Sequence, residues 1–222
     1  MHSGFIDRED AGRRLAERLV ALRLPAPIVV LALPRGGVPV GVPIARALHA
    51  PLDLLLVRKI GVPWQRELAL AAVVDGDPPD LVIDDEVQRQ TGVGRPYIDA
   101  ELPGELREIA RRRSAYLRGR APLPLAGRTA IVVDDGIATG TTMRAALKAL
   151  RRRAPAQLVL AVPLAPRDTL DALTREVDRV VCLEQPWPFG AIGAHYRDFH
   201  QVGDSEVLAA LASLGPEPPP GG

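Results

Sequence analysis

Residues 130–142 read AIVVDDGIATGTT, and this stretch decides the predicted fold. Its apolar part, Ile131 to Val133, is β-branched and shows no polar alternation, which is typical of a strand buried on both faces of a parallel sheet. Two carboxylates follow, then a loop of small and hydroxyl residues, then apolar residues at helical spacing. The stretch therefore predicts a strand, an acid pair, a short loop and a helix N-terminus, in that order.

The loop from Gly136 to Thr142 has the chemistry of a phosphate site. Its backbone N–H groups and the dipole of the following helix favour an anion, and three threonines add hydroxyl donors. The lysine of a Walker-type loop is missing, which argues against hydrolysis of nucleoside triphosphates. Asp134 and Asp135 suit ribose hydroxyls, either directly or beside a Mg²⁺. Since capping a helix needs one acid rather than two, the stretch indicates a sugar-phosphate site.

This stretch resembles the phosphoribosyl-pyrophosphate (PRPP) motif of type I phosphoribosyltransferases. The wider chain is similar to members of that family whose acceptor is unassigned. The resemblance implies that Asp134 and Asp135 hold the 2′ and 3′ hydroxyls of ribose and that the loop holds the 5′-phosphate. It also implies transfer of 5-phosphoribosyl from PRPP to a nitrogenous base or another amine, with release of pyrophosphate. The implied phosphate-binding residues are Gly136, Ile137, Ala138, Thr139, Gly140, Thr141 and Thr142.

A second anion candidate, Pro34-Arg35-Gly36-Gly37, follows the apolar strand predicted over residues 28–33. Paired glycines let backbone N–H groups approach a ligand closely, and the arginine adds a fixed charge, although a plain tight turn is the alternative. By resemblance this is the pyrophosphate loop, formed by Pro34, Arg35, Gly36 and Gly37. Such loops often contain a cis non-proline peptide, and we expect one here.

The next apolar strand is predicted over residues 52–57. Two basic residues, Arg58 and Lys59, stand at its end. Basic residues at the carboxyl end of a parallel strand face the ligand crevice, so Lys59 is a candidate pyrophosphate contact; a solvated edge charge is the alternative. The predicted catalytic set is Asp134, Asp135, Arg35 and Lys59. As an alternative to holding the ribose, Asp135 is the candidate base for the incoming acceptor. No His or Cys cluster exists, so Mg²⁺ would be held largely by the substrate, with Asp134 as the candidate direct ligand.

The whole chain predicts an α/β fold with a doubly wound parallel sheet, because apolar strands alternate with helical patterns. Further strands are expected over residues 157–163 and 179–183, and helices over 7–23, 39–48, 166–177 and 204–214. By resemblance the strand order is 3-2-1-4-5. One phosphoribosyltransferase-like domain covers residues 1–215, with its core in about 26–60 and 119–184, and residues 216–222 are expected to be a disordered tail.

Residues 61–118 interrupt this alternation and, with about 185–203, form the predicted lid and hood. Strands over 68–74 and 81–83 are expected to pair as a hairpin, and a helix is expected to begin near Pro103 and to carry a solvated run of three arginines, 111–113. In the family that the chain resembles, a mobile lid closes over the pyrophosphate. The candidate is 61–68, with Trp64, Arg66 and Glu67; the lysine that some members place there is absent.

Aromatic residues gather in the C-terminal segment 185–203. Trp187, Phe189 and Tyr196 are the candidate acceptor pocket, because flat rings can sandwich a planar base. A small satellite core under a long loop is the alternative.

Composition limits the partners. A net charge of +1 gives no electrostatic footprint for nucleic acid, and no apolar run suits a membrane span or a signal peptide, so we expect a cytoplasmic protein whose partners are small molecules, PRPP and an unknown base. Cys182 stands alone in an apolar pattern and is expected in the core. By resemblance, homodimers are common. Two other functions stay open: a PRPP- or nucleotide-sensing regulator without turnover, and a sugar-phosphate hydrolase.

Overall fold

The computed structural model describes residues 4–76, 78–118 and 120–214. Five parallel strands form its main sheet in the order β2-β1-β6-β7-β8. They are β1 (Ile28–Ala32), β2 (Leu52–Leu54), β6 (Thr129–Val133), β7 (Gln157–Leu164) and β8 (Arg179–Glu184). Counted along the chain the order is 2-1-3-4-5, so the expected order 3-2-1-4-5 is wrong. The reason is that the chain leaves the parallel sheet after β2 instead of adding a strand beside it.

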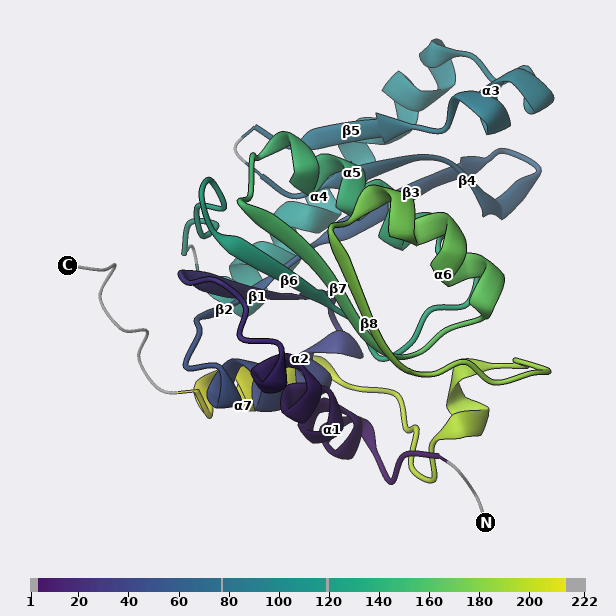
Figure 1. Cartoon of the computed structure of the whole chain (residues 1–222). Helices are drawn as coiled ribbons and strands as arrows, with labels where there is room; N and C mark the ends of the chain where they lie inside the picture. The colour runs from purple at the N-terminus through teal and green to yellow at the C-terminus, as the bar shows by residue number, and fades with distance from the viewer. Residues whose placement is uncertain (1–3, 77, 119, 215–222) are drawn as a thin grey trace.

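Helices cover both faces of the main sheet (Figure 1), which confirms the doubly wound α/β prediction. α1 (Arg8–Ala21) and α2 (Gly37–Ala47) lie on one face, and α5 (Thr141–Arg152) and α6 (Arg167–Leu173) lie on the other. Successive strand residues point to opposite faces. Ile131 and Val133 therefore join the core formed with α1 and α2, whereas Ala130 and Val132 join the core formed with α5. This double burial explains why the strand sequence is apolar throughout.

A second, antiparallel sheet carries the inserted segment. It consists of β3 (Val57–Val62), β4 (Gln65–Val74) and β5 (Asp80–Ile83), in the order β3-β4-β5. The predicted hairpin is confirmed, with Ala72 opposite Val82. The strand predicted over 52–57 is wrong at its end, because β2 stops at Leu54 and Val57 already belongs to the small sheet. The small sheet contacts α5 on one side and α4 on the other.

Two helices follow β5: α3 (Asp85–Thr91), which was not predicted, and α4 (Arg95–Leu117). The expected start at Pro103 is wrong, since Pro103 lies inside α4. Proline favours the first turn of a helix, and Pro96 occupies that position instead. The expectation of three solvated arginines also fails at Arg113, because successive helix residues point about 100° apart. Arg113 turns inward and donates to both carboxylate oxygens of Asp75 at 2.7 Å.

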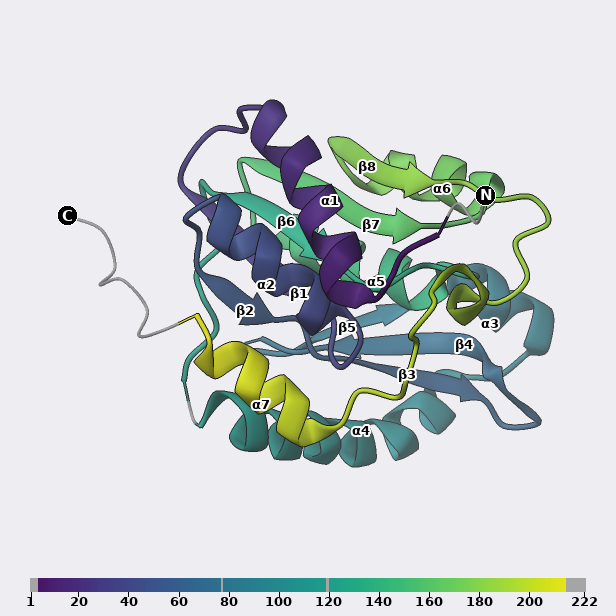
Figure 2. The ribbon, with the colours of Figure 1, turned by 90° about the horizontal axis from the view of Figure 1, so that it is seen from below.

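The C-terminal part returns to the start of the chain. A 3₁₀ turn η1 (Thr174–Glu176) ends the helix predicted over 166–177 early, and η2 (Ile192–His195) lies in the predicted hood. The last helix, α7 (Asp204–Ala212), lies beside α4 and α2 (Figure 2). The predicted tail, 216–222, lies outside the described residues.

Candidate functional site

The acid pair lies at the carboxyl end of β6, where both carboxylates are partly buried. Asp134 Oδ1 accepts a hydrogen bond of 2.9 Å from the backbone N–H of Asp135, which fixes the first side chain. Burial raises the pKa of Asp134 well above its usual range, and the neighbouring charge of Asp135 raises it further. Burial also raises the pKa of Asp135, although the hydrogen bond from Arg8 opposes this. Hydroxyl donors from a ligand would stabilise such a pair.

The loop after β1 packs directly against the acid pair. The backbone N–H of Leu33 donates to the carbonyl oxygen of Val133 at 2.9 Å, which joins the ends of β1 and β6. A Cβ atom on Gly36 would lie 2.0 Å from Asp135 Oδ2, and one on Gly37 would lie 2.8 Å from the Val133 carbonyl oxygen. Any side chain at these positions would displace its neighbours, so glycine is required by the close approach of the two loops.

Arg35 lines a pocket of about 300 Å³ beside this junction. Its Nη1 atom lies 3.7 Å from Asp204 Oδ1 at the start of α7, and the same oxygen accepts a hydrogen bond of 2.6 Å from the Tyr116 hydroxyl. The Pro34–Arg35 peptide is cis, as expected. The pocket is also lined by Arg8, Gly36, Asp135, Phe199 and His200.

The loop between β6 and α5 is held from three sides. The N–H of Ile137 donates to the end of β7 at 3.0 Å, the hydroxyl of Thr169 in α6 donates to the carbonyl of Ala138 at 2.9 Å, and Ile192 of η2 packs against Gly136. Gly140 caps α5 with φ of +73°. Among the described residues, the backbone N–H groups of residues 138–142 make no hydrogen bond, so they are available to an anion.

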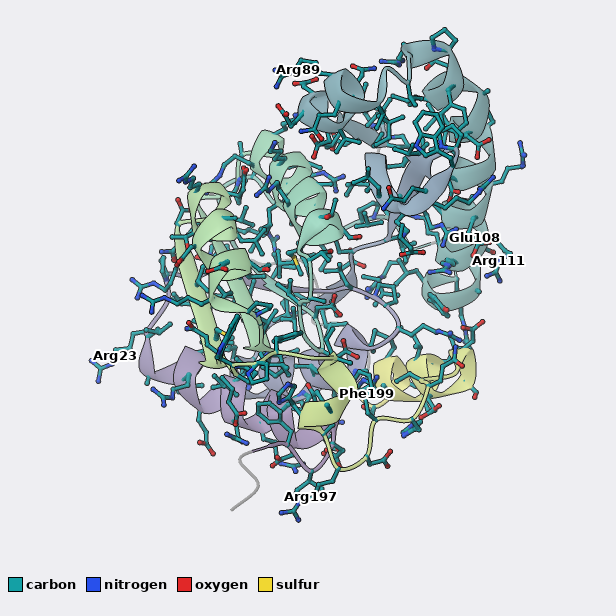
Figure 3. All side chains as sticks on the ribbon, turned by 90° about the vertical axis from the view of Figure 1, so that its right-hand side faces the viewer. Arg23, Arg89, Glu108, Arg111, Arg197 and Phe199 are labelled. Carbon is teal, nitrogen blue, oxygen red and sulfur yellow. The ribbon has the colours of Figure 1, made fainter. Side chains whose placement is uncertain are left out.

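Arg8 is the site residue that the sequence reasoning missed. It is buried, and its Nε donates to Asp135 Oδ2 at 2.7 Å while its Nη1 donates to the carbonyl of His200 at 2.9 Å. The guanidinium also lies 3.8 Å from the ring centre of Phe199, at the point where the C-terminal segment passes the N-terminal helices (Figure 3). One signal was present in the sequence: a cation in the first turn of a helix opposes the helix dipole, so its place calls for another explanation.

Lys59 lies in β3 of the small sheet, not at the end of a parallel strand. It is opposite Ala72, which lines a pocket of about 140 Å³ that also includes Thr139 and Thr141 of the phosphate loop. Lys59 therefore shares the sheet face that looks toward α5. Its neighbour Arg58 faces the opposite way and pairs with Glu105 of α4 at 2.7 Å. The Nζ atom of Lys59 pairs with Glu67 at 2.6 Å.

The predicted lid segment forms the tip of the β3–β4 hairpin. Trp64 at this tip is 69% exposed, and the side chain of Arg66 is 75% exposed and lies 4.0 Å from Glu101. These residues are projected into solvent and do not contact the acid pair.

The three aromatic residues predicted for the acceptor pocket lie in different surroundings. Trp187 is 91% exposed, and Phe189 packs against the ring of His195 at 5.6 Å. Tyr196 is buried with Phe5 in a small separate core, and its hydroxyl donates to the carbonyl of Asp135 at 2.6 Å. Burial raises the pKa of this hydroxyl strongly, so it stays protonated. Among the described aromatics it is Phe199 that lines the pocket beside Asp135.

The described residues contain no group of three or more His, Cys, Asp or Glu side chains that could hold a metal ion. The acid pair by itself fits a Mg²⁺ that takes its remaining oxygen ligands from a diphosphate substrate and water. Burial raises the pKa of the Cys182 thiol to about 11, so the thiol stays protonated at neutral pH. No helix within the described part of the chain has both the length and the apolar character needed to cross a membrane.

Comparison with known proteins shows which family the chain belongs to. The family described as "Phosphoribosyl transferase domain" matches residues 6–198. The "Putative phosphoribosyl transferase" proteins MT0597 and Rv0571c of two Mycobacterium tuberculosis strains are 48% identical over 207 residues, which is 93% of this chain and 46% of each relative. The chain thus spans about half the length of these curated relatives. The crystal structure of TT1426 from Thermus thermophilus is 40% identical and superposes with a TM-score of 0.83, covering 95% of this chain and 98% of that chain. The chain therefore belongs to the phosphoribosyl transferase domain family.

Proposed function

We propose that this protein transfers the 5-phosphoribosyl group of PRPP to a nitrogenous base or another amine and releases pyrophosphate. The observation that carries the proposal is the junction of the two loops, in which the Gly36-Gly37 backbone lies against the Asp134–Asp135 pair. This junction would bring a diphosphate on the first loop next to a sugar diol on the second. The N–H groups at the start of α5 would hold the 5′-phosphate at the far end of the sugar.

The chain's own residues would act mainly by orientation and electrostatics. Cleavage of the bond between ribose C1 and the diphosphate oxygen leaves positive charge on the sugar ring and negative charge on the leaving group. Arg35 and the Gly36 N–H, which has no acceptor among the described residues, would stabilise the leaving diphosphate. Lys59 would join them once it is released from Glu67. The acid pair would hold the sugar in place while the acceptor approaches.

Mg²⁺ would bind together with PRPP and would neutralise charge on the diphosphate, with Asp134 as the candidate protein ligand. An alternative role for Asp135, in place of holding the sugar, is to accept a proton from the incoming amine. The burial that raises its pKa makes it a better base than an exposed carboxylate.

A non-catalytic PRPP-binding regulator is the second candidate. It is favoured by the ion pair of 2.6 Å that occupies Lys59, and by a hairpin tip whose cation, Arg66, points into solvent. Such a protein would use the same sugar-phosphate site for binding alone.

The test combines calorimetric titration with PRPP and an assay of pyrophosphate release in the presence of Mg²⁺ and a panel of purines, pyrimidines and simple amines. The double variant Asp134→Asn/Asp135→Asn is compared with Asp168→Asn, an exposed acid in the first turn of α6. Acceptor-dependent release that the double variant loses and Asp168→Asn keeps supports transfer. Binding without release supports the regulator. Formation of ribose 5-phosphate without an acceptor supports hydrolysis, and equal PRPP binding by the double variant would overturn the assignment of the site.

A further inference from the structure

Arg8 stands at an unfavourable place for an arginine. It is the first residue of α1, where the helix dipole favours anions, and the next two residues, Glu9 and Asp10, follow that rule. Its side chain is only 9% exposed, and a buried guanidinium is costly unless it is paired. Nothing in α1 explains this choice, so its reason lies in the residues that the guanidinium reaches.

The guanidinium joins three parts of the molecule that are far apart in sequence. From α1 it donates to the Asp135 carboxylate at 2.7 Å and to the carbonyl of His200 at 2.9 Å, and it lies against the ring of Phe199. The carbonyl of Asp135 is held in turn by the hydroxyl of Tyr196. The second acid is thus held by both the N-terminal helix and the hood, whereas the first is held by the backbone of its own turn.

The four carboxylate oxygens of Asp134 and Asp135 have different surroundings. Asp134 Oδ1 is taken by the N–H of Asp135, and Asp135 Oδ2 is enclosed by Arg8 and by the Gly36 backbone. No other residue of the described chain donates a hydrogen bond to Asp134 Oδ2 or Asp135 Oδ1. One oxygen of each acid is therefore fixed inside the protein, and one is left for a ligand. Two free oxygens on adjacent residues match the two hydroxyls of a ribose.

We propose that Arg8 is a positioning residue: by binding Asp135 Oδ2 it turns Oδ1 toward the ribose diol and so makes the site selective for ribose over deoxyribose. The inference rests on the proposed function, since it assigns a role toward the same sugar site. In this proposal Arg8 acts through Asp135 and not through a contact of its own with the sugar.

Arg14 offers a matched control in the same helix. Its Nη2 pairs with Glu184 at the end of β8 at 3.2 Å, and its guanidinium lies 4.4 Å from the ring centre of Phe5. It resembles Arg8 in helix, partner type and aromatic contact, but it does not reach the acid pair. Arg8→Gln and Arg14→Gln therefore separate a role toward the sugar from a purely structural one.

The experiment measures the dissociation constants of ribose 5-phosphate and 2-deoxyribose 5-phosphate for the wild type, Arg8→Gln, Arg8→Lys and Arg14→Gln, with thermal unfolding of each. A hydrogen bond to a charged group supports a preference for ribose 5-phosphate of roughly tenfold or more in the wild type. We expect Arg8→Gln to bring this ratio close to one while weakening 2-deoxyribose 5-phosphate by less than about twofold. Arg8→Lys should keep part of the ratio, because it keeps the charge but loses the planar guanidinium that reaches Asp135 and the His200 carbonyl at once. Arg14→Gln should keep the full ratio.

The outcomes are distinguishable from failure of the proposed function. If the wild type binds neither sugar phosphate, or does not discriminate between them, the sugar site itself is wrong. If the wild type discriminates and folded Arg8→Gln retains the same ratio, the role of Arg8 is overturned. An equal loss of affinity for both ligands in Arg8→Gln, matched by a lower melting temperature, would likewise assign it a structural role only.

Discussion

The loops that follow β1 and β6 end two neighbouring parallel strands, yet they contribute to the site in opposite ways. The loop after β6 supplies side chains, two carboxylates and a set of hydroxyls, together with a helix N-terminus. The loop after β1 contributes mainly by lacking a side chain where the two loops meet. A Cβ on Gly36 would lie 2.0 Å from the Asp135 carboxylate. The difference teaches that the site depends on how closely two backbones approach, as well as on the groups they carry.

The largest expected effect comes from filling the space between the two loops. Gly36→Ala places a methyl group against Asp135 Oδ2, so either the carboxylate or the loop must move. We expect an unfolding free energy lower by about 1–3 kcal/mol, as for other overpacked positions. PRPP affinity should fall by roughly 100-fold, because a displaced Asp135 carboxylate loses a charged hydrogen bond to the sugar, worth up to about 3 kcal/mol.

Gly104→Ala is the matched control for this change. Gly104 lies in the interior of α4, and the nearest atom beyond the helix backbone, Nη2 of Arg107, would be 3.9 Å from the new methyl group. Alanine is the better helix former, so stability should rise by up to about 1 kcal/mol with PRPP binding unchanged. If Gly36→Ala bound PRPP as tightly as Gly104→Ala in calorimetric titration, close approach of the loops would not matter for the ligand.

The contrast between local and long-range features explains which parts of the fold and of the site could be predicted from the sequence. The five parallel strands and the helices on both faces were predictable, since burial on two faces leaves a continuous apolar run such as Ile131–Val133. The two loops were found because residue type and place after a strand are both visible in the sequence. Arg8 was not found, because its partner Asp135 is 127 positions away and periodicity reports only neighbours within a few residues.

The inserted segment shows a second limit. The strands β4 and β5 were recognised, but β3 was not, because nothing local reveals that the chain leaves the parallel sheet there to pair with β4. Proline near a helix start was the right signal, but Pro96 rather than Pro103 marked that start. The choice between the two depends on the packing of α4 against the small sheet, which is a tertiary effect.

Asp134→Asn changes the loop after β6 and leaves the loop after β1 unaltered. Because the pKa of Asp134 is raised in the folded protein, the folded state binds its proton more tightly than the unfolded chain does. The wild type therefore loses stability as the pH rises from the unfolded pKa of about 3.8 through the raised folded value. Removing the charge should therefore raise the unfolding free energy at neutral pH, because the folded state no longer buries a charged carboxylate.

The same variant should bind PRPP roughly tenfold more weakly, since the sugar loses a charged hydrogen-bond partner. Thermal unfolding between pH 4 and pH 8 gives the check, because the stability gain should shrink as the wild-type acid becomes protonated. A variant that is less stable than the wild type at neutral pH would contradict the electrostatic description of the pair.

Tyr196→Phe is expected to have a smaller effect, confined to the loop after β6. It removes the hydroxyl that donates to the Asp135 carbonyl at 2.6 Å and leaves the small core with Phe5 intact. We expect an unfolding free energy lower by about 1–2 kcal/mol and a loss of PRPP affinity of only a few fold. Urea unfolding and titration measure the two quantities. The prediction fails if the variant loses as much affinity as Gly36→Ala.

The smallest effect should follow from releasing Lys59, which tests whether the small sheet assists the loop after β1. In the Lys59–Glu67 pair the Glu67 side chain is exposed to solvent. Glu67→Gln should therefore change the unfolding free energy by less than about 1 kcal/mol. The freed cation faces α5 and the phosphate loop, and we expect PRPP to bind a few fold more tightly, with a steeper dependence on salt. Glu105→Gln frees Arg58 on the opposite face of the same strand and should leave the affinity unchanged. Equal effects of the two changes would mean that only net charge matters, because a contact with the diphosphate depends on which face of β3 the cation occupies.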